Sequence, residues 1–220
     1  DFQNVHQAVN SGFDIMLLKP FSMATLLGRV HQLIRQRAPF VVTSDYIGPD
    51  RRQNQSKGQS GARNSGEEML ITVPNPLKMM ATGAVSLARM RHAIEEGVTK
   101  VNERRVICNS ERISQLVGIL ASQYMLSNLD QEFVRGLKRL QAICGEMDRR
   151  LKRSKFAHAA DLCDTMETVV SRILEAPLSP HSKDIELLQN LGYAIDRAFH
   201  SDKSEIKAAR TISDSIRAVA

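Results

Sequence analysis

A short segment, Gly12–Ser22 (GFDIMLLKPFS), constrains the fold more than any other part of this chain. Gly12 can end a helix, because glycine readily adopts the left-handed conformation that follows many helices. Ile15–Leu18 is a continuous apolar run, which is typical of a short strand buried on both faces of a parallel sheet. Pro20 cannot continue such a strand, since it has no amide hydrogen to donate. The segment therefore predicts a helix end, one buried strand and a new helix that Ser22 can cap.

Apolar residues at helical spacing flank this segment on both sides. Lys19 follows the predicted strand at its carboxyl end, which is the edge where open α/β sheets bind ligands. From the residues alone, Lys19 is either such a contact or an ordinary exposed lysine. The apolar positions before the segment are Phe2, Val5 and Val9, and those after it are Leu26, Leu27, Val30, Leu33 and Ile34.

This pattern of helix, strand, Lys-Pro and Leu-rich helix resembles the end of the receiver domain of two-component response regulators. The resemblance covers residues 1–37 and corresponds to the fourth helix, fifth strand and fifth helix of that domain. It implies that Lys19 contacts the phosphoryl group of a phosphorylated aspartate, where a lysine ammonium acts as a point charge. It also implies a cis peptide bond before Pro20.

The resemblance implies parts that these 220 residues do not contain. The acidic pair that binds Mg²⁺, the acceptor aspartate and the Ser/Thr switch residue all precede Asp1 in the family pattern. Asp14 does not replace them, because it lies just before the predicted strand. Met16 stands where the family often has an aromatic switch residue. We therefore expect a truncated receiver end with no cofactor of its own, since Mg²⁺ is expected only for the intact receiver domain.

Residues 38–68 are rich in Gln, Ser, Gly, Asn and Arg, which predicts a flexible linker. It contains the motif DYIGPDRR (Asp45–Arg52), in which Gly48-Pro49-Asp50 is a turn signal. Similar GPDRR tails follow the receiver in some bacterial response regulators. Arg51 and Arg52 either dock on an acidic surface or begin a solvated linker.

Residues 69–220 carry apolar side chains at helical spacing almost throughout. An extended segment ends at Pro74-Asn75-Pro76, and successive stripes follow. Asn109 or Ser110 can cap the second stripe and Asp130 the third. The predicted fold class is therefore mainly α, with a truncated α/β receiver end (one strand, two helices) and an antiparallel helical bundle. The predicted stripes are 87–101, 113–124, 133–151, 156–173, 185–199 and 206–219.

Basic residues gather between Arg135 and Lys155, where they outnumber Glu146 and Asp148. This basic helix, 135–155, can bind nucleic acid, anionic lipid or an acidic protein, or it can be a solvated helix end. It lacks aromatic stacking residues and a convincing helix-turn-helix, so nucleic acid is the less favoured partner. The candidate residues for binding an anion or a partner are Arg149, Arg150, Lys152 and Arg153.

Other chemistry is poorly supported by the sequence. His92 and His158 are candidates for phosphotransfer, but neither is followed by the Lys and Gly that phosphotransfer modules have. Cys108, Cys144 and Cys163 each lie in a helical pattern, which favours buried thiols in the reduced cytoplasm. We find no metal-ligand spacing and no nucleophile motif, and we predict no enzyme. No apolar run is long enough to predict a membrane contact.

Together these patterns favour a fragment of a response regulator in phosphorelay signal transduction, with output by protein–protein interaction through the helical domain, 69–220. The expected partners are a sensor histidine kinase for the intact parent and a protein partner for the helical domain, and a homodimer is left open. One alternative is a DNA-binding transcriptional regulator that uses the basic helix 135–155. A second alternative is a helical phosphotransfer protein.

Overall fold

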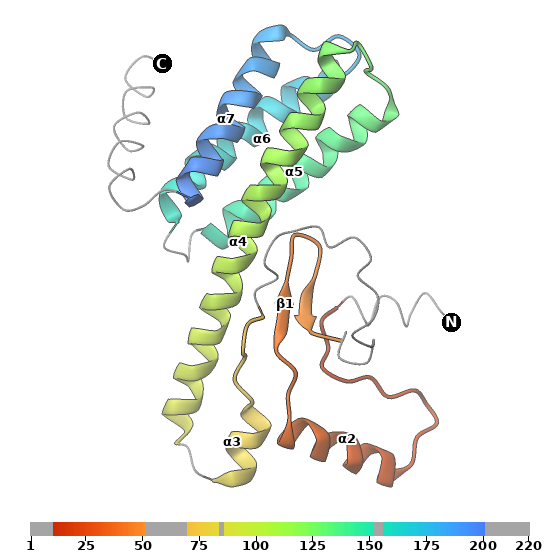
Figure 1. The fold of residues 1–220 in the computed structure, drawn as a ribbon, viewed down its shortest axis with the longest axis vertical. Helices are drawn as coiled ribbons and strands as arrows, with labels where there is room; N and C mark the ends of the chain where they lie inside the picture. Colours follow the sequence, from red (N-terminus) through yellow and green to blue (C-terminus); the bar gives the residue numbers. More distant parts are fainter. Residues whose placement is uncertain (1–10, 52–69, 84–85, 152–155, 201–220) are drawn as a thin grey trace, which may run out of the picture. The chain divides into compact units, whose positions relative to one another are not determined.

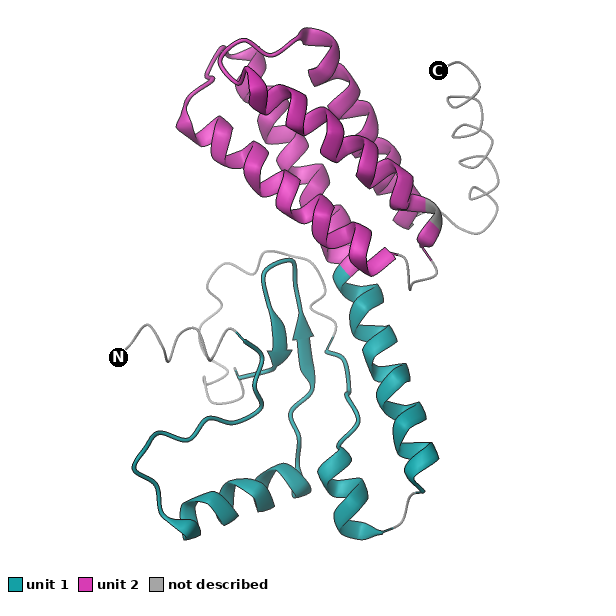
Figure 2. Cartoon of the chain, turned by 180° about the vertical axis from the view of Figure 1, so that it is seen from behind, with its two compact units in different colours: residues 1–105 teal, residues 106–220 magenta. Residues whose placement is uncertain are grey.

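The computed structural model describes residues 11–51, 70–83, 86–151 and 156–200 of the chain (Figure 1). The described part is mainly helical with a small antiparallel sheet, so the prediction of a mainly α fold is confirmed. The chain divides into two compact units, residues 1–105 and 106–220 (Figure 2). The predicted helix before Gly12 and the predicted stripe 206–219 lie outside the described residues.

The described part of unit 1 contains two short helices and the beginning of a long one. Helix α2 (Met23–Arg35) begins where predicted, because the Ser22 side chain accepts a hydrogen bond from the Thr25 amide at 3.1 Å. Helix α3 (Pro76–Thr82) follows Asn75, whose side chain caps it in the same way. Neither helix contains a buried residue. The third helix, α4 (Leu87–Met125), continues into unit 2.

The prediction of a buried strand at Ile15–Leu18 is wrong. These residues have no strand conformation, and the Leu18 side chain is 70% exposed. A strand needs backbone partners for its amide and carbonyl groups. Within the described residues, strand pairing involves only β1, β2 and the bridge between Phe40 and Ile71, so Ile15–Leu18 has no neighbouring strand.

A β-hairpin occupies part of the segment that the composition assigned to a flexible linker. Strands β1 (Phe40–Val42) and β2 (Ile47–Pro49) pair antiparallel, with Val41 opposite Gly48. The turn is at Thr43–Tyr46, where the Thr43 hydroxyl accepts the amide of Tyr46 at 3.1 Å. The Gly48-Pro49-Asp50 turn prediction is therefore wrong. Pro49 is tolerated in β2 because it lies at the strand end, where no central ladder bond is lost.

The long helix α4 joins two stripes that were predicted as separate helices. Asn109 and Ser110 lie inside it and cap nothing; both side chains are fully buried. Asn and Ser favour caps only where a helix end leaves backbone groups unbonded, and here the neighbouring turns satisfy those groups. The boundary between the units also falls inside α4, whereas the composition changes at residue 69.

The described part of unit 2 is a helical bundle built from the second half of α4 and three further helices, α5 (Gln131–Leu151), α6 (Ala160–Glu175) and α7 (Ser182–His200). A short 3-10 helix, η2 (Ala157–Ala159), precedes α6. Successive helices run in opposite directions (Figure 1), which confirms the predicted antiparallel arrangement. The stripe predicted for α5 is fully buried, namely Phe133, Leu137, Leu140, Cys144, Met147 and Leu151.

The predictions for the Asp130 cap and for the three cysteines are also confirmed. Asp130 begins α5, because its carboxylate accepts the amides of Glu132 at 2.8 Å and Phe133 at 3.1 Å. All three cysteines are free and buried. Burial raises the pKa of the Cys163 thiol to about 12, so this thiol stays protonated and unreactive at neutral pH.

The buried side chain of Asn109 leads to a prediction about the stability of the bundle. Among the residues that the structure describes, neither its amide nitrogen nor its amide oxygen has a hydrogen-bond partner. Burying such a group costs about 1–3 kcal/mol, so Asn109→Leu is expected to raise the free energy of unfolding by a similar amount. Urea unfolding followed by circular dichroism measures this. Asn109→Ala removes the same polar atoms but leaves a cavity, so its gain is smaller. A loss of stability in Asn109→Leu would contradict the prediction.

Candidate functional site

The two residues singled out by the resemblance lie in the loop before α2. Lys19 and Pro20 are exposed, and the peptide bond between them is cis, as the resemblance implies. Lys19 therefore presents its ammonium group to solvent on a loop whose two ends are held. The capped start of α2 at Ser22 holds one end.

Two glycines hold the other end of this loop. Gly12 has a φ of +75°, and a Cβ atom placed on it would lie 2.2 Å from the Ile47 carbonyl oxygen. A Cβ atom on Gly48 would lie 2.7 Å from the Gly12 Cα and 2.4 Å from the Tyr46 hydroxyl. The two backbones can approach this closely only because neither residue has a side chain. The Gly12–Ser22 segment and the DYIGPDRR motif are thus packed against each other.

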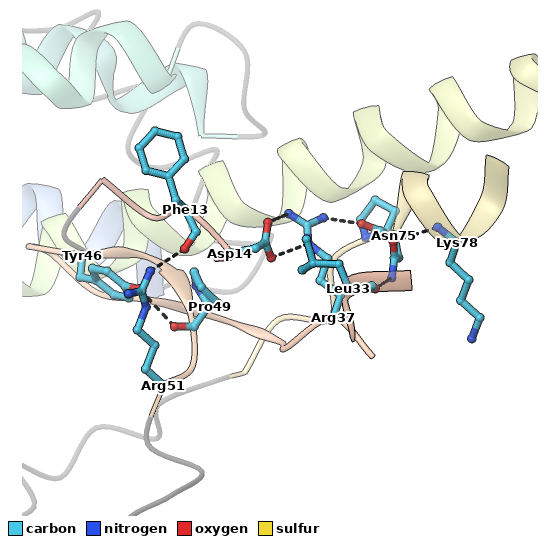
Figure 3. A network of polar contacts seen from close by, with 10 residues as sticks. Phe13, Asp14, Leu33, Arg37, Tyr46, Pro49, Arg51, Asn75 and Lys78 are labelled. Atoms are coloured by element: carbon cyan, nitrogen blue, oxygen red, sulfur yellow. Dashed lines mark hydrogen bonds and ion pairs between the residues drawn. The ribbon is translucent and has the colours of Figure 1, made fainter. Parts of the chain in front are cut away.

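An ion pair fixes the loop to the chain after α2 (Figure 3). The guanidinium of Arg37 donates two hydrogen bonds to the Asp14 carboxylate, from Nε at 2.8 Å and from Nη2 at 2.9 Å. Both side chains are largely shielded, with 22% and 24% of their areas exposed. Arg37 also donates to the Pro74 carbonyl oxygen and lies 5.0 Å from the centre of the Phe40 ring. One side chain therefore joins the loop, the hairpin and the segment before α3.

Asn75 extends the same network to α3 (Figure 3). Its side-chain oxygen accepts the Lys78 amide at 3.1 Å, and its side-chain nitrogen donates to the Leu33 carbonyl oxygen at 2.6 Å. One bond caps α3, and the other satisfies a carbonyl in the last turn of α2. The adjacent Pro74 packs on Gly97 of α4, where a Cβ atom would lie 2.7 Å from the proline ring.

The DYIGPDRR motif contributes two further bonds. The Arg51 guanidinium donates to the Phe13 carbonyl oxygen at 2.5 Å, and the Tyr46 hydroxyl donates to the Pro49 carbonyl oxygen at 3.1 Å (Figure 3). Arg51 thus serves the fold of unit 1, which neither of its two predicted roles included. Arg52 lies outside the described residues.

We name this set, Asp14, Arg37, Pro74 and Asn75, the Arg37 network. No sequence pattern predicts it: Asp14 is noted only as lying before the predicted strand, and Arg37 only as the end of the receiver-like segment. An Asn between two prolines at the start of a helix is the one available signal, because Asn is a strong cap and Pro favours the first helical position. The long-range pair between Asp14 and Arg37 leaves no signal in the sequence.

The predicted basic site on α5 is only partly described. Arg149 is exposed. Arg150 pairs with Glu146 one turn earlier, at 2.8 Å. Lys152 and Arg153 lie outside the described residues. The described part of this helix end is thus less available to an anion than its composition indicates.

Metal chemistry and membrane insertion find no structural support in the described residues. They contain no group of three or more His, Cys, Asp or Glu side chains that could hold a metal ion. Among them, no helix combines the length and the apolar character needed to cross a bilayer. Comparison with family models, curated proteins and solved structures found no match for the chain.

The contribution of the ion pair between Asp14 and Arg37 to stability can be measured. In a double-mutant cycle with Asp14→Asn and Arg37→Met, we expect a coupling energy of about 1 kcal/mol, a value reduced for partial exposure. Arg37→Met alone should cost more than Asp14→Asn, because Arg37 also donates to Pro74. Hydrogen exchange at the Phe40 and Ile71 amides reports the loss. A coupling energy near zero, unchanged by salt, would show that the ion pair does not contribute to the stability of unit 1.

Proposed function

We propose that this chain is part of a response regulator in two-component signal transduction, and that its helical part acts by binding another protein. The observation that carries the proposal is the segment Gly12–Ser22, with Lys19 in an exposed loop before a capped, amphipathic helix. Lys19 would contact the phosphoryl group of an aspartate that these 220 residues do not supply. A sensor histidine kinase would phosphorylate the intact protein, in the cytoplasm.

The close packing of two separate motifs supports this proposal. Gly12–Ser22 resembles the end of a receiver, and DYIGPDRR resembles a tail that follows receivers. Gly12 and Gly48 bring the two into contact, and Arg51 bonds to Phe13. A loop that reports the state of a phosphorylation site needs a defined position, and this packing provides one.

The Arg37 network offers a physical route from this loop to the helical part. Asp14 binds Arg37, Arg37 binds the Pro74 carbonyl, and Pro74 packs on Gly97 of α4. A displacement of the Lys19 loop would therefore act on the segment that contacts α4. Spatial continuity is a route and not a measured coupling, so the cycle of Asp14 and Arg37 variants is the appropriate probe.

Mg²⁺ would be held by the acidic pair of the intact receiver domain, which precedes Asp1 in the family pattern. The test is to read the coding sequence upstream of Asp1 and to incubate the encoded protein with Mg²⁺ and acetyl phosphate. We expect an acidic pair and an acceptor aspartate upstream, and a phosphoryl label that hydroxylamine removes. If those residues are missing, or no aspartate is labelled, the proposal fails.

The same experiment addresses phosphotransfer by a histidine. His92 is exposed on α4, and His158 lies in η2. A label that survives alkali, which hydrolyses an aspartyl phosphate, and is lost in His92→Gln or His158→Gln would replace our proposal with a phosphotransfer protein. We expect neither substitution to change the label.

Protein binding is favoured over DNA binding by the charges on α5. Arg135 pairs with Glu132 at 3.0 Å and Arg150 with Glu146 at 2.8 Å, so acidic neighbours offset part of the basic helix. In a gel-shift assay we expect weak binding that salt removes and that does not depend on sequence. Tight, sequence-selective binding that is lost in Arg149→Ala would establish the DNA-binding alternative.

A further inference from the structure

The first half of α4 carries an apolar stripe that is exposed in the described part of unit 1. Leu87 is 62% exposed, Ile94 36% and Val98 54%. Their spacings of seven and four residues place them on one face of the helix. Arg91 lies between Leu87 and Ile94 on this face, so the four positions follow the alternating spacing of a helix-pairing seam.

The neighbouring face of the same helix is already occupied within unit 1. Gly97 packs on Pro74, and Arg105 donates a hydrogen bond to the Thr43 carbonyl oxygen. These contacts fix α4 against the hairpin and the segment before α3. They leave the face with Leu87, Ile94 and Val98 directed to solvent.

We propose that this stripe pairs with the same stripe of a second copy of the chain, with the two helices antiparallel. Antiparallel pairing about a point between residues 92 and 93 sets Leu87 opposite Val98 of the other copy. It also sets Arg91 opposite Ile94 of the other copy. The aliphatic part of Arg91 would then cover Ile94, while its guanidinium remains at the edge of the seam.

Charge complementarity favours a second copy of the chain as the partner that covers this stripe. Glu95 borders the stripe one residue after Ile94, so the antiparallel pair brings Arg91 of each copy next to Glu95 of the other. A charged pair in this part of α4 joins Lys100 to Glu96, at 2.7 Å, and it does not use these two residues. A parallel pair would instead set the two Arg91 side chains against each other in the seam, which is repulsive.

The seam sets the expected strength of the dimer. From Leu87 to Val98 a helix is about 16 Å long, which is shorter than the contact of most stable dimers. The association is therefore weak and depends on concentration. It is independent of the proposed signalling role, because it needs only α4 and its neighbours in unit 1.

Analytical ultracentrifugation of the full chain tests the pairing. We expect the dimer fraction to rise with concentration, and Leu87→Asp or Val98→Asp to weaken association by at least about tenfold. Leu126→Asp is the matched control, because Leu126 is 79% exposed in unit 2 and outside the stripe. A chain that stays monomeric, or a dimer that Leu126→Asp weakens as much as Leu87→Asp, would overturn the proposal.

Charge variants and cross-links test the direction. Arg91→Glu and Glu95→Arg should each dimerise poorly alone, while a mixture of the two should form heterodimers. A mixture of Leu87→Cys and Val98→Cys chains should form a disulfide on oxidation, because antiparallel pairing brings these positions together. Leu87→Cys alone should not, since its two copies lie about 16 Å apart along the axis. Efficient cross-linking of Leu87→Cys with itself would exclude the antiparallel arrangement.

Discussion

Replacing Gly12 with alanine is expected to destabilise unit 1 by about 2–5 kcal/mol, through two separate costs. A non-glycine residue in the left-handed conformation costs about 1–2 kcal/mol, and Gly12 has a φ of +75°. The new Cβ would also lie 2.2 Å from the Ile47 carbonyl oxygen, which is backbone and cannot rotate away. Overpacking of this kind costs about 1–3 kcal/mol.

Hydrogen exchange measures the effect locally. The Thr43 amide bonds to the Tyr46 carbonyl and the Asp50 amide to the Pro39 carbonyl, so both report on the hairpin. A loss of about 2 kcal/mol accelerates their exchange by about 30-fold, since each 1.4 kcal/mol corresponds to a factor of ten.

Alanine variants of two other glycines distinguish the cost of the left-handed conformation from the cost of the steric overlap. Gly83 has a φ of +60°, but a Cβ atom added to it would have no heavy atom within 4 Å, so Gly83→Ala should lose only about 1 kcal/mol. Gly28 lies inside α2 with neither constraint, and Gly28→Ala should stabilise the helix by about 0.5–1 kcal/mol. Equal effects for Gly12→Ala and Gly83→Ala would show that the close approach of Gly12 to β2 does not exist in solution.

The second large effect is expected in the bundle. Leu137→Ala removes a fully buried side chain from the core of unit 2. Truncation of a buried leucine costs about 2–5 kcal/mol, because apolar contact is lost and a cavity remains. Urea unfolding followed by circular dichroism should show a lower midpoint with an unchanged slope.

Leu126→Ala is the matched control for this variant. The same atoms are removed, but Leu126 is 79% exposed, so the change should stay within about 0.5 kcal/mol. A loss below about 1 kcal/mol for Leu137→Ala would mean that the α5 stripe does not form the core of the bundle in solution.

The bundle could be predicted because its information is local. In α5 the positions Phe133, Leu137 and Leu140 recur at the period of a helix, and each is fully buried. Asp130 marks the start of that helix by a rule that involves only three neighbouring residues. The same reliance on local pattern led to the wrong prediction that α4 is two separate helices. Asn109 and Ser110 are cap residues by type, but the helix continues through them and buries both.

Unit 1 is harder to predict because its contacts join residues far apart in the chain. The apolar run Ile15–Leu18 has the composition of a strand, but composition does not provide a neighbouring strand. The polar segment at 38–68 has the composition of a linker, yet Val41 and Val42 are buried in a hairpin. The candidate site shows the same limit. A local motif singles out Lys19, whereas no local pattern singles out Arg37.

Local sequence patterns are sufficient to predict the helical character, the α5 core stripe, the caps at Ser22 and Asp130, and the motif around Lys19. These features depend on residues within one or two turns of each other, where spacing and backbone chemistry are sufficient. The packing of Gly12 against Gly48 and the ion pair between Asp14 and Arg37 become visible only in the folded unit. Those contacts depend on where distant backbone segments meet, and such a meeting is set by the packing of the whole unit and not by any local pattern.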